Sequence, residues 1–169
     1  KVSAVKAKDV KEEFGNKIKY ILDGGACAIG IESTIVNLIG RPSILRLGGL
    51  DILKIQKTLG FKTSISINPK KKIAPGQSRL HYSPGIPLRM NVTKPKNDEA
   101  FIIIMRKKIK PKNYFYLTTK NNLDEAAKNL YSCLRNIKNE GYKSIAVEKI
   151  PNIGLGKAIN DRLRRASKY

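Results

Sequence analysis

Residues 113–150 read NYFYLTTKNNLDEAAKNLYSCLRNIKNEGYKSIAVEKI, and this stretch decides the fold class. Its opening, NYFYL (113–117), is rich in aromatic residues and predicts a strand. Residues 123–141 predict a long helix, because six apolar side chains recur on one face and Gly141 ends the pattern. SIAVEKI (144–150) then predicts a buried strand. A strand, a helix and a strand in this order favour a small α/β layer with parallel pairing.

The segments on both sides extend this layer. PLRMNV (87–92) and AFIIIM (100–105) predict two further strands, and LGKAINDRLRRASKY (155–169) predicts a terminal helix. We therefore expect residues 87–169 to form one small α/β domain.

Residues 1–67 predict another folded part. Ser3 is expected to cap a helix that runs to Phe14 and ends at Gly15. A second helix is expected over residues 50–60. Its inward side chains should be Leu50, Leu53, Ile55 and Leu59. Four extended segments are also expected, at 19–25, 30–38, 43–49 and 63–67.

Residues 68–86 separate these two parts. Their proline and glycine content predicts an interdomain linker rather than an element of either domain. The stretch APGQSRLHYSPGIP (74–87) nevertheless holds the chain's one histidine, His81, beside Tyr82, and such side chains usually contact something. As a lone histidine without an identified partner, His81 is more often a structural residue than a catalytic base.

Composition narrows the function classes. The formal net charge is +21, which would attract phosphates, but the lysines are scattered and favour solvated faces over a specific nucleic-acid surface. No apolar run approaches the roughly 20 residues of a membrane span. Cys27 and Cys133 form no CxxC pair, cannot build a zinc site with one histidine, and predict packed, reduced thiols in a cytoplasmic protein.

Three places in the sequence offer polar groups for a ligand. Glu32, Ser33 and Thr34 bring a carboxylate and two hydroxyls together, although serine and threonine are common in strands. Arg46 stands at a strand end before two glycines, as a phosphate or carboxylate clamp or as a surface arginine at a turn. Glycines open the helix at 152–161, which can hold an anion but usually marks only a helix start.

Four motifs occur in the order that is typical of one protein family. They are ILDGGACAIGIESTIVNL (21–38), SILRLGG (43–49), APGQSRLHYSPGIPLR (74–89) and GLGKAINDRLRRA (154–166). With them the chain resembles the two-domain threonylcarbamoyl-AMP synthases over essentially its whole length. The resemblance implies the C-terminal portion of a YrdC-like twisted α/β sheet, an extended linker and a small Rossmann-like α/β domain.

The resemblance also implies a reaction. The family joins L-threonine, bicarbonate and ATP, with Mg²⁺ as part of the substrate complex, into threonylcarbamoyl-AMP and pyrophosphate. A separate tRNA threonylcarbamoyl transferase then uses the product to modify adenosine 37 of tRNA. No catalytic residue and no resident metal ligand is identified in this chain.

Several residues take roles from the resemblance. Ser3 resembles a serine that lines the ATP site, Ser33 resembles the residue that contacts threonine, and Arg46 resembles the arginine that meets the nucleotide phosphate. Leu47 replaces the proline of the family's ILRPGG and is expected to loosen that turn. In the linker, which closes over the nucleotide as a lid, the family's residues are Pro75, Gly76, His81 and Tyr82; Leu80 stands where an arginine is common.

Two further family motifs, KxR and SxN, are expected upstream of Lys1. The string Ser66-Ile67-Asn68 falls on the wrong side of Arg46 to be the second. We therefore expect the last third of the catalytic domain, the linker and the C-terminal domain, without adenylate synthesis by this chain alone. The alternative is a regulatory module, derived from the family, that binds tRNA or a nucleotide.

Overall fold

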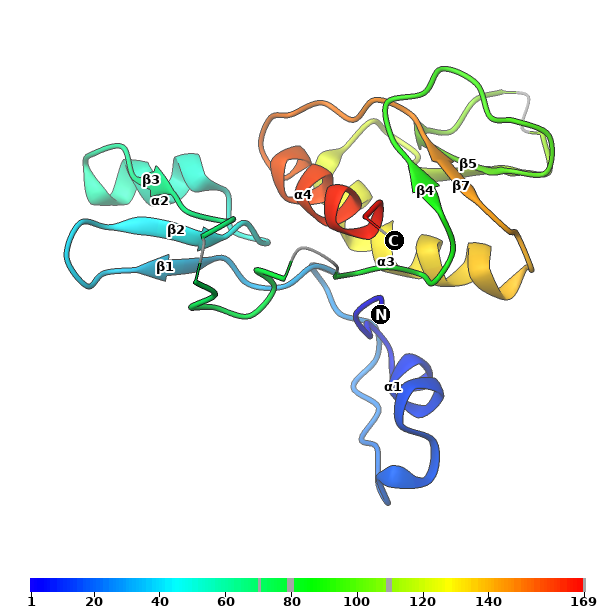
Figure 1. The fold of residues 1–169 in the computed structure, drawn as a ribbon, viewed down its shortest axis with the longest axis horizontal. Helices are drawn as coiled ribbons and strands as arrows, with labels where there is room; N and C mark the ends of the chain where they lie inside the picture. The colour runs from blue at the N-terminus through cyan, green and yellow to red at the C-terminus, as the bar shows by residue number, and fades with distance from the viewer. Residues whose placement is uncertain (70, 79–80, 109–110, 169) are drawn as a thin grey trace.

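The computed structural model describes residues 1–69, 71–78, 81–108 and 111–168. Within them the chain is an α/β protein with two separate sheets, each accompanied by helices (Figure 1). The α/β class expected from the sequence is therefore confirmed. Arg79 and Leu80 of the expected linker lie outside the described residues.

The four-stranded sheet is parallel throughout, as predicted. Its order is β4-β7-β5-β6, formed by β4 (Leu88–Arg89), β5 (Ala100–Met105), β6 (Tyr114–Thr118) and β7 (Ile145–Val147). Helix α3 (Leu123–Asn139) connects β6 to β7, and α4 (Gly156–Ala166) follows β7 and packs against α3.

The long helix α3 matches its predicted face. Its first turn is capped by Asn122, whose side-chain oxygen accepts from two backbone N–H groups. The fully buried side chains on the predicted stripe are Ala126, Ala127, Leu130, Leu134 and Ile137. This apolar stripe fixes α3 against the sheet.

The smaller sheet has the order β1-β2-β3. β1 (Ile35–Asn37) pairs antiparallel with β2 (Ser43–Arg46), which pairs parallel with β3 (Ser64–Ile65). Residues 66–87 lead from this sheet to β4. The domain limits at 67 and 87 stay a prediction.

The inward face predicted for helix α2 (Ile52–Leu59) is partly wrong. Asp51 accepts a hydrogen bond from the Leu53 N–H and so starts the helix after Leu50. As a result, Leu50 and Leu53 are 51% and 61% exposed, whereas Ile52 is only 5% exposed. Ile55 and Leu59 are partly buried, so the predicted inward face holds at these two positions and fails at Leu50 and Leu53, where Ile52 is the buried side chain instead.

The N-terminal segment also differs from expectation. Helix α1 (Ala7–Phe14) begins after Lys6, not after Ser3, and the Asp9 carboxylate accepts from the N–H groups just before the helix. Phe14 is 47% exposed instead of packed. Residues 19–25 form no strand, because they pair with no other strand in the described part of the chain, and propensity alone does not make a ladder.

One cluster of buried apolar side chains runs through both parts of the protein. It joins Ile44 and Ile52 from around the first sheet to Leu130 and Leu163 from α3 and α4, with Tyr82 from the linker between them. Cys133 is buried, but Cys27 is exposed, contrary to expectation. None of the helices that the structure describes has the length and apolar character needed to cross a membrane.

Candidate functional site

Two residues predicted for different ligands contact each other. Arg46 ends β2, and its Nε and Nη2 atoms each donate a 3.0 Å hydrogen bond to Ser33, to the carbonyl oxygen and to Oγ respectively. The antiparallel pairing of β1 with β2 explains this contact, because it sets Ile35 opposite Arg46. Ser33, which is predicted to contact threonine, and Arg46, which is predicted to meet the nucleotide phosphate, therefore share one edge of the small sheet.

Ser3, which is predicted to line the ATP site, is joined to the same edge through Glu32. Its Oγ donates a 2.6 Å hydrogen bond to Glu32 Oε1. Burial alone would raise the pKa of Glu32, but the Arg162 guanidinium and the Ser3 hydroxyl outweigh it and hold the pKa below its usual range. Glu32 is thus an anion whose oxygens are bound by the protein itself.

The turn after β2 packs closely on this cluster. A Cβ atom at Gly48 would lie 2.2–2.3 Å from the backbone of residues 32–34, so only glycine fits. The Gly49 N–H donates to the Glu32 carbonyl at 2.9 Å, and the Thr34 hydroxyl donates to the Leu50 carbonyl at 2.6 Å. These contacts restrain the turn that the replacement by Leu47 was expected to loosen.

The linker crosses beside Arg46. Gly76 has a φ of +84°, and a Cβ atom there would lie 2.6 Å from the Tyr82 hydroxyl and 3.0 Å from Arg46 Cδ. Pro75 is exposed next to it. Gly76 of the predicted lid thus lies against Arg46, the residue predicted to meet the nucleotide phosphate.

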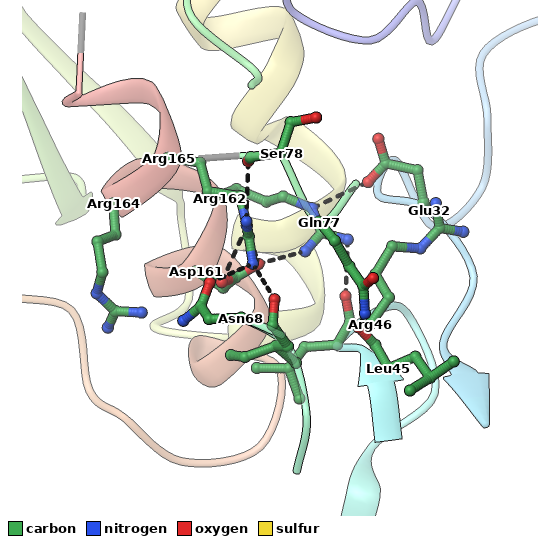
Figure 2. A network of polar contacts seen from close by, with 12 residues as sticks. Glu32, Leu45, Arg46, Asn68, Gln77, Ser78, Asp161, Arg162, Arg164 and Arg165 are labelled. Atoms are coloured by element: carbon green, nitrogen blue, oxygen red, sulfur yellow. Dashed lines mark hydrogen bonds and ion pairs between the residues drawn. The ribbon is translucent and has the colours of Figure 1, made fainter. Parts of the chain in front are cut away.

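Gln77 pins the linker in this place, and sequence reasoning missed it. The side chain is buried, and its amide donates to the carbonyls of Leu45 and Ser66 at 3.1 and 3.2 Å. Its oxygen accepts from the N–H groups of Ile73 and Ala74. Figure 2 shows Gln77 lying over β2 beside Arg46. A single glutamine in a linker gives no sequence signal for four such contacts.

Tyr82 enters the core from the linker. It has a φ of 61°, is fully buried and stacks on Tyr131 of α3 with ring centroids 5.7 Å apart. The Arg162 guanidinium lies 4.8 Å from its ring centroid. Among the described residues, the buried Tyr82 hydroxyl has no hydrogen-bond partner. Tyr82 therefore anchors the linker between the two parts of the protein.

His81 packs edge-on against Tyr82, with ring centroids 4.0 Å apart. Burial lowers the pKa of His81, so its imidazole is neutral at pH 7. This contact favours the fastening role over a catalytic base. A cavity of about 450 Å³ lies beside His81, between the linker, α1 and α3, but neither Ser33 nor Arg46 lines it.

The glycines before α4 support a plain helix start. The N–H groups of Gly156 and Lys157 already donate to the carbonyls of Ile153 and Gly154. Sequence reasoning missed what α4 does further along. Asp161, Arg162 and Arg165 are buried and face the linker and the small sheet (Figure 2). Among the described residues, no group of three or more acidic, histidine or cysteine side chains forms a metal centre.

Comparison with known proteins places this geometry among relatives. Residues 48–168 match the family model described as "Threonylcarbamoyl-AMP synthase, C-terminal domain", and residues 1–48 match one described as "Telomere recombination". Proteins named threonylcarbamoyl-AMP synthase from Pyrococcus abyssi and Schizosaccharomyces pombe are 33% and 30% identical, over 100% and 95% of this chain. That from Bacillus subtilis is 28% identical over 99% of the chain. The chain spans about half the length of these relatives, 48–55%.

Solved structures of the P. abyssi protein Sua5 have the same fold. The crystal structure of Sua5 complexed with L-threonine superposes with a TM-score of 0.84, at 31% identity, over 100% of this chain and 55% of that one. A second structure, with a histidine and the next residue, a tyrosine, both replaced by alanine, gives a TM-score of 0.82 at 29% identity, over 100% of this chain and 54% of that one.

Proposed function

Because the chain belongs to the family of threonylcarbamoyl-AMP synthase C-terminal domains, we propose that it is the C-terminal part of an enzyme that makes threonylcarbamoyl-AMP. The substrates would be L-threonine, bicarbonate and ATP with its Mg²⁺, and pyrophosphate would leave. The observation that supports this best is the pair of hydrogen bonds from Arg46 to Ser33. In this contact, the guanidinium that we propose for the phosphate lies beside the hydroxyl that we propose for the amino acid.

The proposed reaction requires these residues to position the reactants and to neutralise charge. The threonine amine attacks the carbon of bicarbonate to give a carbamate and water, and a carbamate oxygen then attacks the α-phosphorus of ATP and displaces pyrophosphate. We propose that Ser33 binds threonine and that Arg46 neutralises charge on the nucleotide phosphates. Ser3 would line the nucleotide side. Mg²⁺ belongs to the ATP substrate, so no resident metal site is proposed.

The linker supplies the proposed lid. Gly76 lies next to Arg46, Tyr82 stacks on Tyr131 of α3, and His81 packs against Tyr82. We propose that this segment covers the bound nucleotide and excludes water from the reacting phosphate. The product would pass, in the cytoplasm, to a tRNA threonylcarbamoyl transferase.

The test is adenylate formation by a complete protein, in which this chain follows the segment that its relatives carry ahead of it. We expect pyrophosphate release that requires all three substrates, and a product with the mass of threonylcarbamoyl-AMP. Arg46→Ala should lower the rate about 100-fold, because one charged contact to the transferring phosphate is lost. Arg41→Ala, an exposed arginine in the preceding turn, is the matched control. A protein that releases no pyrophosphate would refute the proposal.

The regulatory module is the second candidate, favoured by the net charge of +21. It predicts that the 169-residue chain alone binds tRNA with an affinity that falls steeply between 50 and about 200 mM salt. The synthase proposal predicts weak tRNA binding and no adenylate synthesis by this chain alone.

A further inference from the structure

We propose that Arg162 of α4 is a positioning residue. From the C-terminal part of the protein, it holds in place the edge of the small sheet that carries Ser33 and Arg46. This inference rests on the proposed function for the identity of the ligands. The hydrogen bonds of Arg162 go to residues other than Ser3, Ser33 and Arg46, and its guanidinium lies over the ring of the predicted lid residue Tyr82. Arg162 acts on the edge through neighbouring residues, Glu32 before Ser33 and Leu47 after Arg46.

The geometry is a clamp on two points of the small sheet. Arg162 is 1% exposed, and its Nε donates to Glu32 Oε2 at 3.0 Å while Nη2 donates to the Leu47 carbonyl at 2.7 Å. Since Arg46 in turn binds Ser33, these residues form a closed ring of contacts. A guanidinium group offers several donors in one rigid plane, whereas a lysine ammonium is a compact point charge without that planar arrangement.

The partners of Arg162 are themselves held. Asp161 accepts from its Nη1 at 3.0 Å, and the Tyr131 hydroxyl lies 3.1 Å from its Nε. Glu32 extends the network to Ser3 through its other oxygen. One branch of the network thus runs through Glu32 to Ser3 and the other ends at Leu47, and each of these residues is predicted to meet a ligand or is next to one that is.

Arg165, one turn later, binds the linker in the same way. It donates to the carbonyls of Ser78 and Ile67 at 2.9 and 2.8 Å and to Asn68 Oδ1 at 3.1 Å. Asp161 accepts from both arginines and so fixes one guanidinium relative to the other (Figure 2). One turn of α4 therefore sets the position of the site edge and of the proposed lid together.

Fold stability alone gives a weak reason for this arrangement. Two cations and a carboxylate are buried, and well-packed apolar side chains of similar volume often stabilise a protein as well as such a group does. Here the two arginines donate to backbone carbonyls of the small sheet and of the linker. Such directional hydrogen bonds fix where these segments lie more specifically than an apolar contact does.

The first experiment needs no activity. Hydrogen exchange in the 169-residue chain is compared between Arg162→Lys and Arg164→Lys, whose arginine points to solvent from the same helix. The reporters are the amides of Gly49 and Leu50, which donate to the Glu32 carbonyl and the Thr34 hydroxyl. We expect them to exchange at least tenfold faster in Arg162→Lys, while the amides of α3 keep their rates. Equal rates in both variants would overturn the inference.

If Arg162→Lys unfolds the chain, Glu32→Gln serves in its place. It keeps the shape of the side chain, removes the charge that Arg162 binds, and should raise exchange at Gly49 and Leu50 by a smaller factor. Unchanged exchange there would count against the clamp.

The second experiment uses the complete protein. Arg162→Lys should raise the KM for L-threonine about tenfold, Arg164→Lys should leave it unchanged, and Glu32→Gln should add less than twofold to Arg162→Lys, because both act through one contact. An unchanged KM in Arg162→Lys, or full additivity, would contradict the inference. A wild-type protein without any adenylate synthesis would refute the proposed function instead, and the exchange data would still decide the clamp.

Discussion

The Tyr131 hydroxyl donates a 2.8 Å hydrogen bond to the Glu32 carboxylate, although 99 residues separate the two in sequence. This contact joins α3 to the predicted ligand edge through a single oxygen atom. Removing that atom therefore measures how much the contact between the two parts contributes to stability.

Tyr131→Phe keeps the ring that stacks on Tyr82 and removes only this oxygen. Because a hydrogen bond to a charged group is lost in a buried place, the free energy of unfolding should fall by about 2 kcal/mol. Urea unfolding measures it. Tyr20→Phe, at a side chain that is 78% exposed, should change it by less than about 0.5 kcal/mol. Equal effects of the two substitutions would show that the contact contributes nothing.

Gly76→Ala tests the close approach of the linker to Arg46. The backbone there has a φ of +84°, and the new methyl group would meet the Tyr82 hydroxyl. The left-handed backbone alone costs about 1 kcal/mol, and the clash adds to it, so we expect a loss of about 2 kcal/mol in urea unfolding. Gly24→Ala is the control, since neither strain nor a neighbour within 4 Å is present there. A neutral Gly76→Ala would place the linker further from Arg46.

Gln77→Leu tests the anchor inside the linker. The leucine fills a similar volume but leaves the carbonyls of Leu45 and Ser66 without this donor. Each buried group left without a partner costs about 1–3 kcal/mol, and we expect a total loss of about 3 kcal/mol by thermal or urea unfolding. Gln56→Leu, which removes one 3.4 Å contact to Thr63, should cost much less. A stability equal to that of the wild type would exclude Gln77 as an anchor.

The single histidine makes a pH test simple. Burial lowers the pKa of His81 in the folded chain, whereas the unfolded chain takes up the proton at about pH 6.5. Below that pH the unfolded state binds more protons than the folded state. The stability that the neutral His81 contributes is therefore fully present above about pH 6.5 and decreases as the pH falls.

Unfolding of the wild type and of His81→Asn should therefore be compared at pH 7.5 and 5.5. The wild type should lose more stability over this interval than His81→Asn, which has no imidazole to titrate. A proton NMR titration of the one imidazole gives its pKa directly. A value above 6.5 would reverse the sign of the prediction.

Sequence reasoning was most reliable where the signal is local. The stripe of Leu130, Leu134 and Ile137 and the run AFIIIM predicted α3 and β5, because period and capping are written in neighbouring residues. On α2 only Leu50 and Leu53 were wrongly placed inward, since Leu50 precedes the Asp51 cap and Ile52 is the buried side chain. Residues 19–25 were misread as a strand, because propensity does not supply a partner strand.

The candidate site divides in the same way. Ser33 and Arg46 were expected from short motifs, and the pairing of β1 with β2 brings them together. Gln77 and Arg162 lie within two of the quoted motifs, but the sequence indicated no contact for either. Gln77 binds a carbonyl 32 residues away, and Arg162 reaches Glu32 across 130 residues. A contact of this range depends on how two folded parts meet, which composition and periodicity do not encode.

The separation of Glu32 and Arg162 in sequence also determines when their contact can form during translation. A ribosome adds about 5–20 residues per second, so Glu32 waits on the order of ten seconds before Arg162 exists to bind it. Throughout that interval the nascent sheet edge has a carboxylate without its cation. The edge is therefore completed late in translation, and a chain that stops before α4 never assembles it.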